Sequence, residues 1–327
     1  FLTLGIHNAQ VTGLDGWDLF IDPGHSQDEN MGINGYSEAK EVLQVGLELM
    51  DILNSQSDID TVYISRTNDN QSVSLYQRTN YANTVGASWF HSIHSDASSN
   101  LNTNRTLLLW GQLYNGNPDP PIGGQEMSSY MINTLTKGMR IDSTGSWGDC
   151  SFYTWSDYCA NSGGPYLYVN RNTNMPSELS EQGHHSNPLQ NQLAMNEEYK
   201  KMVAYLLFWS ILDYHNIERP FVGQLAGQIF DLETQKTING AIISIDHFQY
   251  VTDTYESLFY EFSNDESDGY SNGFYWFNGL SDSTYEVIYD APGYYPDTSI
   301  ITILDTFITF NDIDLISSQP PYVLNSN

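Results

Sequence analysis

The stretch that decides the fold is Trp17-Asp18-Leu19-Phe20-Ile21-Asp22-Pro23-Gly24-His25. Residues 17–21 form a short apolar run, which predicts one buried β-strand. Pro23 lacks a backbone N–H and Gly24 tolerates unusual backbone angles, so this pair ends the strand. His25 therefore follows the carboxyl end of a strand, and open α/β sheets bind their ligands at that edge.

Strand and helix patterns alternate from this point to about residue 217. Further strands are expected at 61–65, 87–93, 105–110, 166–169 and 177–180. Helices are expected to begin near Ser37 and to cover 74–85, 127–139 and 189–214. Ser37 is a favourable N-cap residue. This alternation predicts an α/β fold, with a mostly parallel sheet flanked by helices. The polar segment 142–164 is expected to be a long loop, of the kind that often forms the rim or lid of an active site.

The pattern changes after Glu218-Arg219-Pro220. From residue 222 to 316 the chain shows short β-type runs separated by turns, which predicts a second, small all-β sandwich domain. The predicted organisation is therefore an N-terminal tail at 1–16, an α/β domain at 17–217, the β-sandwich at 222–316, and a linker or tail at 317–327.

The charge of the chain excludes several classes of partner. Its 40 acidic residues outnumber the 11 Lys and Arg residues, which gives a formal net charge of −29. Such a surface repels phosphate backbones and anionic lipids, so we expect no nucleic-acid binding. No run reaches the ~18 apolar residues of a membrane helix, so we expect no membrane insertion.

The start of the sequence and its cysteines point to an oxidising compartment. The chain begins Phe1-Leu2-Thr3-Leu4, with neither an initiator Met nor a positively charged signal region. A mature secreted, extracellular or periplasmic protein has this character, although a shortened piece of a longer chain would look the same. Cys150 and Cys159 are the two cysteines, and in an exported protein they are expected to form a disulfide. Two free thiols in a reducing cytosol are the alternative.

Four residues form a candidate catalytic constellation. His25, His94 and Glu181 follow predicted strands, and Glu38 opens a predicted helix, so all four could face one cleft at the sheet's carboxyl edge. Two imidazoles and one carboxylate are the ligands of a catalytic zinc site that keeps a position for water. Zinc lowers the pKa of that water to roughly 7. A further carboxylate can then take the proton of the water and pass it to the leaving amine.

Six short motifs lie in order along the first predicted domain: Ile21-Asp22-Pro23-Gly24-His25, Gly35-Tyr36-Ser37-Glu38, Ser65-Arg66-Thr67, Leu75-Tyr76-Gln77-Arg78, Ser92-Ile93-His94 and Glu181-Gln182-Gly183-His184-His185-Ser186-Asn187. Through them, residues 17–215 resemble the zinc-dependent N-acetylmuramoyl-L-alanine amidases of the type-3 amidase family. The resemblance implies zinc ligation by His25, Glu38 and His94, with Glu181 as the general base. It also implies hydrolysis, in peptidoglycan, of the amide between the lactyl group of muramic acid and L-alanine.

The chain departs from the family pattern around these motifs. Ser26-Gln27-Asp28 follow the first motif, and Ser95-Asp96-Ala97 follow the fifth. His184 and His185 replace a hydrophobic pair, and they are either substrate or oxyanion contacts or exposed loop histidines.

Two further choices remain open in the sequence. Glu178 competes with Glu181 for the role of base, but residues three apart in a strand point to opposite faces, and the continuation of the motif favours Glu181. Arg171 and Arg66 could bind substrate carboxylates by bidentate contacts. For Arg66, a structural salt bridge is the favoured interpretation.

The second domain is similar to the carboxypeptidase regulatory-like, transthyretin-type β-sandwich. The residues that carry this similarity are Gly227–Asp231, Thr237–Ala241, Ser271–Phe274, Gly279-Leu280, Tyr285–Val287 and Ala291–Tyr294. It implies a spacer, a stabiliser or a weak binding module. The acidic cluster Asp265-Glu266-Ser267-Asp268 is either a calcium site or a solvated turn.

Two alternatives to a peptidoglycan amidase remain at this stage. The chain could be a non-catalytic structural or binding protein that keeps the amidase fold and self-associates through the β-domain, as a filament or surface-layer subunit. It could also be a zinc hydrolase that acts on another amide, such as that of an exported peptide.

Overall fold

The computed structural model describes residues 11–252 and 271–318, and the chain divides into two compact units. The first unit holds residues up to Ala194 together with Lys200–Arg219, and the second holds Met195–Tyr199 and the residues from Pro220 onward. The acidic cluster at 265–268 lies outside the described residues. The described part of the expected N-terminal tail is bonded to the chain, since the N–H groups of Gly13 and Leu14 donate to the Asp58 carboxylate.

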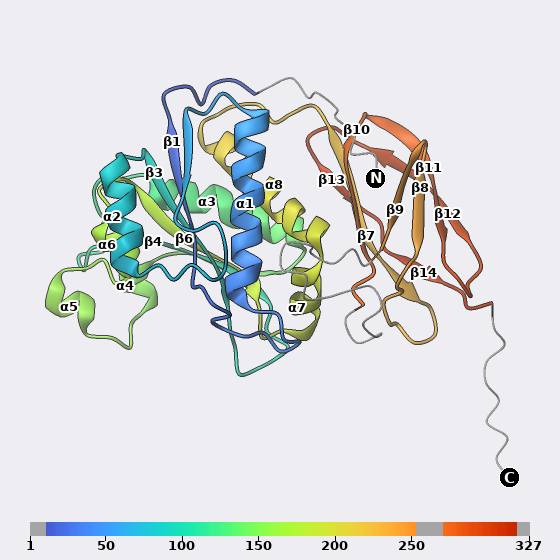
Figure 1. Cartoon of the computed structure of the whole chain (residues 1–327), viewed down its shortest axis with the longest axis horizontal. Coiled ribbons are helices and arrows are strands. Elements are labelled where there is room, and N and C mark those ends of the chain that lie inside the picture. Colours follow the sequence, from blue (N-terminus) through green and yellow to red (C-terminus); the bar gives the residue numbers. More distant parts are fainter. Residues whose placement is uncertain (1–10, 253–270, 319–327) are drawn as a thin grey trace, which may run out of the picture. The chain divides into compact units, whose positions relative to one another are not determined.

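The first unit is built on a six-stranded sheet with the order β2-β1-β3-β6-β4-β5 (Figure 1). Its strands are β1 Asp18–Pro23, β2 Thr61–Ile64, β3 Trp89–Asp96, β4 Arg105–Trp110, β5 Asp142–Gly148 and β6 Ser177–His184. Strands β2, β1, β3 and β6 run parallel, whereas β4 is antiparallel to β6 and carries β5 parallel to itself. The predicted α/β class with a mostly parallel sheet is confirmed.

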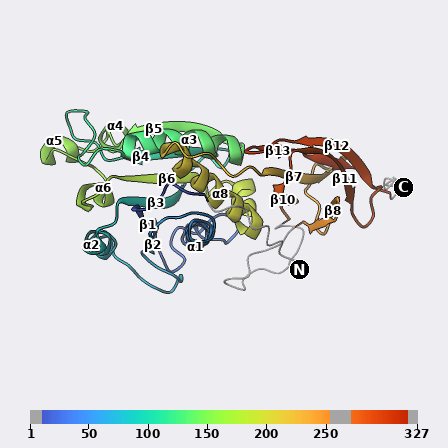
Figure 2. The ribbon, with the colours of Figure 1, turned by 90° about the horizontal axis from the view of Figure 1, so that it is seen from above.

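Helices cover both faces of this sheet, as expected for parallel strands that are apolar on both sides. Figure 2 shows α1 (Glu38–Gln56), α3 (Gly124–Met139) and α8 (Glu197–Tyr214) on one side, with α2 (Leu75–Val85) and α6 (Tyr168–Asn172) on the other. The remaining helices are α4 (Asp149–Phe152), α5 (Tyr158–Ser162) and α7 (Pro188–Met195).

The N-termini of α1 and α2 are fixed by serine caps. The Ser37 hydroxyl accepts a hydrogen bond from the Lys40 N–H, as the sequence predicted. Ser74 and Gln77 form a reciprocal capping box at the start of α2. The cap at Ser37 places Glu38 as the first residue of its helix, at the carboxyl edge of the sheet.

Three predicted segments differ in the structure. The run 166–169 was expected to be a strand, but α6 begins within it; a short apolar run alone does not distinguish the two. The segment 142–164 is not one loop, since it holds β5, α4 and α5. The helix expected at 189–214 is interrupted at Asn196, whose side-chain oxygen accepts the Tyr199 N–H and so caps a new helix.

Two strands extend further than the sequence indicated. β3 continues to Asp96 and β6 continues to His184, so His94 and Glu181 lie within strands rather than after them. Because strand residues alternate between the two faces of a sheet, the side-chain directions of both residues are fixed by the pleat.

The second unit is all-β, as predicted. One sheet joins β10 (Phe274–Leu280), β7 (Gly223–Asp231), β13 (Ile308–Phe310) and β14 (Ile313–Leu315), and the other joins β12 (Asp297–Ile303), β11 (Ser283–Asp290), β8 (Ile242–Ile245) and β9 (Phe248–Val251). Both sheets contribute to one apolar core, with Leu225 and Tyr275 from the first and Val287 and Ile303 from the second. Its likeness to the carboxypeptidase regulatory-like domain stays a prediction.

None of the helices within residues 11–252 and 271–318 combines the length and the apolar character that crossing a membrane requires.

Candidate metal centre

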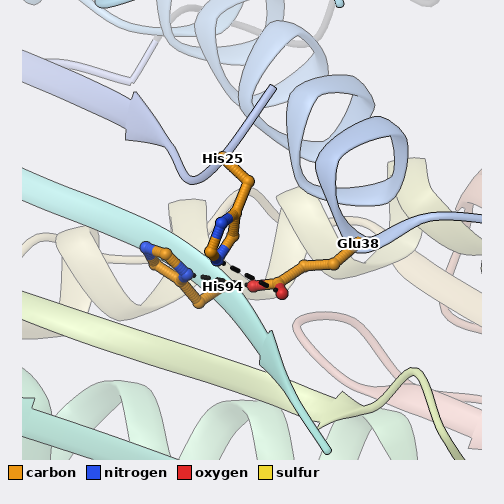
Figure 3. A group of neighbouring side chains, drawn as sticks. All are labelled: His25, Glu38 and His94. Carbon is orange, nitrogen blue, oxygen red and sulfur yellow. Dashed lines mark hydrogen bonds and ion pairs between the residues drawn. The ribbon is translucent and has the colours of Figure 1, made fainter. Parts of the chain in front are cut away.

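His25, Glu38 and His94 meet at the carboxyl edge of β1 and β3 (Figure 3). His25 follows the end of β1, Glu38 opens α1, and His94 lies near the end of β3. One candidate ligand atom from each side chain lies within 4.8 Å of the others. Three of the four residues of the predicted constellation are therefore brought together as one candidate metal site.

The Glu38 carboxylate contacts both imidazoles, which lie edge to face with their centroids 4.9 Å apart (Figure 3). Its Oε1 atom is 2.9 Å from His94 Nδ1, and its Oε2 atom is 3.4 Å from His25 Nε2. The backbone N–H of Ser95 donates to Oε1 at 3.0 Å. These contacts hold the carboxylate in one orientation, facing both rings.

Asn30 completes the cluster and was missed in the sequence. Its side-chain amide donates to Glu38 Oε2 at 2.6 Å and lies 3.1 Å from His25 Nε2. Asn30 belongs to the polar loop that follows the Ile21–His25 motif, and no spacing rule marked it there. Asn30 thus orients the Glu38 carboxylate, as hydrogen-bond partners of the ligands do in metal sites.

The charge states of the cluster suit a divalent cation. Burial raises the pKa of Glu38, but the hydrogen bond and charge of His94, followed by the charge of His25, lower it to about 2. Burial lowers the pKa of His25, which favours the neutral imidazole with a free lone pair. An anionic carboxylate and a neutral imidazole are donors found in many metal sites. The His25 side chain is 30% exposed, so the site is open to a substrate.

Two buried arginines hold the turn that presents His25. Arg66 donates to the carbonyl oxygens of Pro23 at 3.1 Å and Gly24 at 2.7 Å. Arg78 donates to the carbonyl oxygens of Pro23 at 2.6 Å and His25 at 2.7 Å. These bonds stabilise a left-handed backbone at His25, where φ is 55°. Both guanidinium groups are therefore structural, including that of Arg66.

Arg78 also pairs with a buried acid. One of its nitrogens lies 2.6 Å from Asp22 Oδ1, and the other carboxylate oxygen of Asp22 accepts from the Ser92 hydroxyl at 2.9 Å. Asp22 and Ser92 are paired in the register of β1 and β3. The ion pair therefore links α2 to both strands that carry the imidazoles.

Gly24 is required by the same turn. A Cβ atom built at this position would lie 2.3 Å from the nearest atom of the His94 imidazole. Real Cβ atoms do not approach neighbours so closely, so any side chain at position 24 would displace a candidate ligand. The glycine of the first motif is explained by this close approach to His94.

Glu181 faces the same side of the sheet as His94, because the two residues are paired in the parallel register of β3 and β6. Within the described part of the chain, its Oε2 atom is buried and meets no hydrogen-bond donor. Burial raises the pKa of Glu181 well above its usual range, and the negative charges of Glu38 and Asp96 raise it further. The environment of this carboxyl is typical of a group that exchanges protons.

Glu178, the competing candidate, faces the opposite side of the sheet. Its carboxylate oxygens lie 2.6 Å from His91 Nδ1 and 2.5 Å from Trp89 Nε1. Both partners are buried, and so is Glu178. Glu178 therefore binds Trp89 and His91 on the face of β3 and β6 opposite to that of His94.

His184 and His185 are buried, so the interpretation of both as exposed loop histidines is wrong. His185 Nδ1 lies 3.0 Å from the Ser95 carbonyl oxygen and 3.8 Å from Glu38 Oε2, beside the cluster. His184 is directed elsewhere: its Nδ1 atom accepts the N–H of Arg105 at 3.2 Å. The strand pairing that continues past Glu181 encloses both rings.

The structure does not bring Arg171 to the cluster. Its guanidinium donates to the carbonyl oxygens of Pro165 and Tyr166 and lies 4.5 Å from the centre of the Tyr158 ring. The predicted disulfide between Cys150 and Cys159 is present. It closes the segment that holds α4 and α5, directly before the loop that Arg171 supports.

Comparisons with known proteins agree with this arrangement. A family model described as N-acetylmuramoyl-L-alanine amidase matches residues 19–213. The N-acetylmuramoyl-L-alanine amidase CwlM of Bacillus licheniformis is 46% identical over 80 residues, which are 24% of this chain and 31% of that protein. The sporulation-specific N-acetylmuramoyl-L-alanine amidase of Bacillus subtilis (strain 168) is 46% identical over 77 residues, 23% of this chain and 30% of that protein. The matches thus span about a third of each curated relative.

A solved structure has a similar fold. The crystal structure of N-acetylmuramoyl-L-alanine amidase from Clostridium difficile 630 superposes with a TM-score of 0.50 at 25% sequence identity. The superposition covers 62% of this chain and 98% of that one.

Replacing Arg78 by Met is expected to lower the free energy of unfolding of the first unit by about 3–5 kcal/mol, because it leaves the Asp22 carboxylate buried without its partner. Urea denaturation followed by tryptophan fluorescence measures the loss. The matched control is Arg105→Met, which removes an exposed guanidinium at the start of β4 and should change stability by less than about 0.5 kcal/mol. Equal stability of the two variants would contradict the role assigned to Arg78.

Proposed function

The chain belongs to the N-acetylmuramoyl-L-alanine amidase family, and from this premise we propose that its first unit is a zinc-dependent peptidoglycan amidase. The proposed reaction is hydrolysis of the amide that joins the lactyl group of N-acetylmuramic acid to L-alanine. The observation that carries the proposal is the group His25, Glu38 and His94, with the Glu181 carboxyl on the same face of the sheet.

His25, Glu38 and His94 are the proposed zinc ligands. Three protein ligands of the N and O type, open to solvent on one side, fit a catalytic rather than a structural zinc site. When bound, zinc supplies Lewis acidity to the scissile carbonyl and lowers the pKa of water. The chain's own contribution is to hold the three donors in place, through Asn30 and Ser95 at Glu38 and through the two arginines at His25.

Glu181 is the proposed general base. Its carboxyl takes the proton of the attacking water and returns it to the amine of L-alanine as the amide bond breaks. The raised pKa of Glu181 supports its role as base, because a carboxylate whose pKa is raised binds a proton more strongly than an ordinary carboxylate. Its free oxygen supports this role too, since no protein donor within the described residues occupies it.

Among the three predicted substrate contacts, His185 is the one that lies beside the cluster. We keep it as a proposed contact to the substrate. The contacts of His184 and Arg171 within the chain leave them as weaker candidates. Because peptidoglycan lies outside the cytoplasm, the proposed location is secreted, extracellular or periplasmic, which the disulfide also supports.

Replacing His94 by Ala is expected to abolish both zinc binding and hydrolysis, since two donors cannot retain the ion. Elemental analysis after dialysis measures the metal, and new amino groups of L-alanine released from peptidoglycan measure the reaction. The control is His247→Ala, which removes an exposed histidine of the second unit. A His94→Ala protein that keeps about one zinc per chain would contradict the ligand assignment.

Replacing Glu181 by Gln is expected to leave zinc content unchanged and to lower kcat by about 10²–10⁴-fold, the usual contribution of a general base. The control is Glu126→Gln, an exposed change of the same chemistry on α3. Zinc analysis and amide hydrolysis on the same preparations separate the two effects. If Glu181→Gln retained the activity of the control, the base would have to be another group.

A further inference from the structure

Five aromatic side chains gather on the segment between β5 and α6, and we call them the aromatic platform: Phe152, Tyr153, Trp155, Tyr158 and Tyr166. The ring of Tyr153 stacks on that of Tyr166, with centroids 4.2 Å apart. Trp155 meets Tyr153 edge to face at 5.1 Å. Tyr158 contacts Tyr166 edge to face, with ring centroids 6.0 Å apart. The rings form one continuous cluster.

The platform lies beside the proposed base. Phe152 and Tyr153 pack against an apolar cluster that contains Leu107 and Leu179. Leu107 is paired with Glu181 in the antiparallel register of β4 and β6, so the two residues share one face of the sheet. Burial raises the pKa of the Tyr153 phenol, and the nearby carboxyls of Glu181 and Asp96 raise it further. The aromatic platform therefore lies next to the carboxyl group of Glu181, the proposed base.

The outer part of the platform is open to solvent. The Trp155 side chain is 72% exposed, although burying it would be favourable by the hydrophobic effect. Exposed apolar groups that are clustered rather than scattered mark surfaces that bind something. Phe152 and Tyr153 pack on the cluster of Leu107 and Leu179, whereas Trp155 is exposed to solvent. The platform is therefore a supported surface rather than an unpacked piece of core.

The charges around the platform disfavour an anionic ligand. Asp157 is exposed on the same segment, and the guanidinium of Arg171 donates to two backbone carbonyl oxygens and lies over the Tyr158 ring. An uncharged group therefore suits these rings better than an anionic one. Pyranose sugars have this character, because their C–H faces stack on aromatic rings while their hydroxyl edges remain in water.

We propose that the aromatic platform is a subsite for a sugar ring of the glycan strand, with Trp155 as its main stacking residue. The inference rests on the proposed function, since in that reaction the muramic acid ring is attached through its lactyl group to the amide that is cleaved. A sugar must then lie next to the reacting carbonyl, and the platform is an aromatic surface next to Glu181. The Cys150–Cys159 disulfide brackets Phe152, Tyr153 and Trp155 and limits their movement before the sugar binds.

The test uses the β-1,4-linked trisaccharide of N-acetylglucosamine, which contains the sugar and no stem peptide. Isothermal titration calorimetry on the full chain after chelation measures its binding without any need for metal or hydrolysis. Trp155→Ala is expected to weaken binding about tenfold or more, as the loss of an aromatic anchor does. The control is Tyr295→Ala, which removes an exposed aromatic side chain of the second unit and should bind as the wild type does.

The outcomes separate this inference from the proposed function. Equal trisaccharide binding by Trp155→Ala and Tyr295→Ala overturns the subsite, as does a wild-type chain that does not bind millimolar trisaccharide. Loss of stem-peptide binding in Trp155→Ala, with sugar binding unchanged, also overturns it and assigns the platform to the peptide. A chain that binds the sugar through Trp155 but hydrolyses no muramoyl amide supports the subsite and refutes the amidase reaction alone.

Discussion

The site depends on hydrogen bonds from two buried guanidinium groups. They donate to the carbonyl oxygens of Pro23, Gly24 and His25. An arginine offers five donors in a rigid fork, so two arginines can bind all three carbonyl oxygens of this turn. This explains why motifs around Arg66 and Arg78, far from His25 in sequence, accompany the histidine. The two arginines fix the backbone position of His25, a proposed zinc ligand, and their contacts are within the chain.

The functional groups are ordered across the carboxyl edge of the sheet. His25 follows β1, His94 lies on the neighbouring β3, Glu181 lies on β6, and the aromatic platform packs over β4. Under the proposed function, the strand order sets the order of three tasks: metal ligation, proton transfer and sugar binding. Because neighbouring strands lie ~4.8 Å apart, adjacent groups are within reach of a single muramoyl amide.

The sequence predicted the parts of this arrangement that follow from local rules. The strand that ends at Pro23 and the serine cap before Glu38 were both predictable, and the period of two in a strand separated Glu181 from Glu178 correctly, since they face opposite sides. Tertiary contacts decided the rest. Asn30 lies in an irregular loop that no periodic pattern describes, and the burial of His185 depends on Ser95, which is distant in sequence. The short run at 166–169 has no periodicity that distinguishes helix from strand.

The most direct test of the account is a paired measurement on one preparation of the unaltered chain. Zinc is determined by elemental analysis, and release of L-alanine amino groups from peptidoglycan is measured before chelation, after chelation and after zinc is restored. The account predicts about one zinc per chain, with hydrolysis that is lost and regained with the metal. A chain that binds no zinc would contradict the account and favour a non-catalytic protein that keeps the amidase fold.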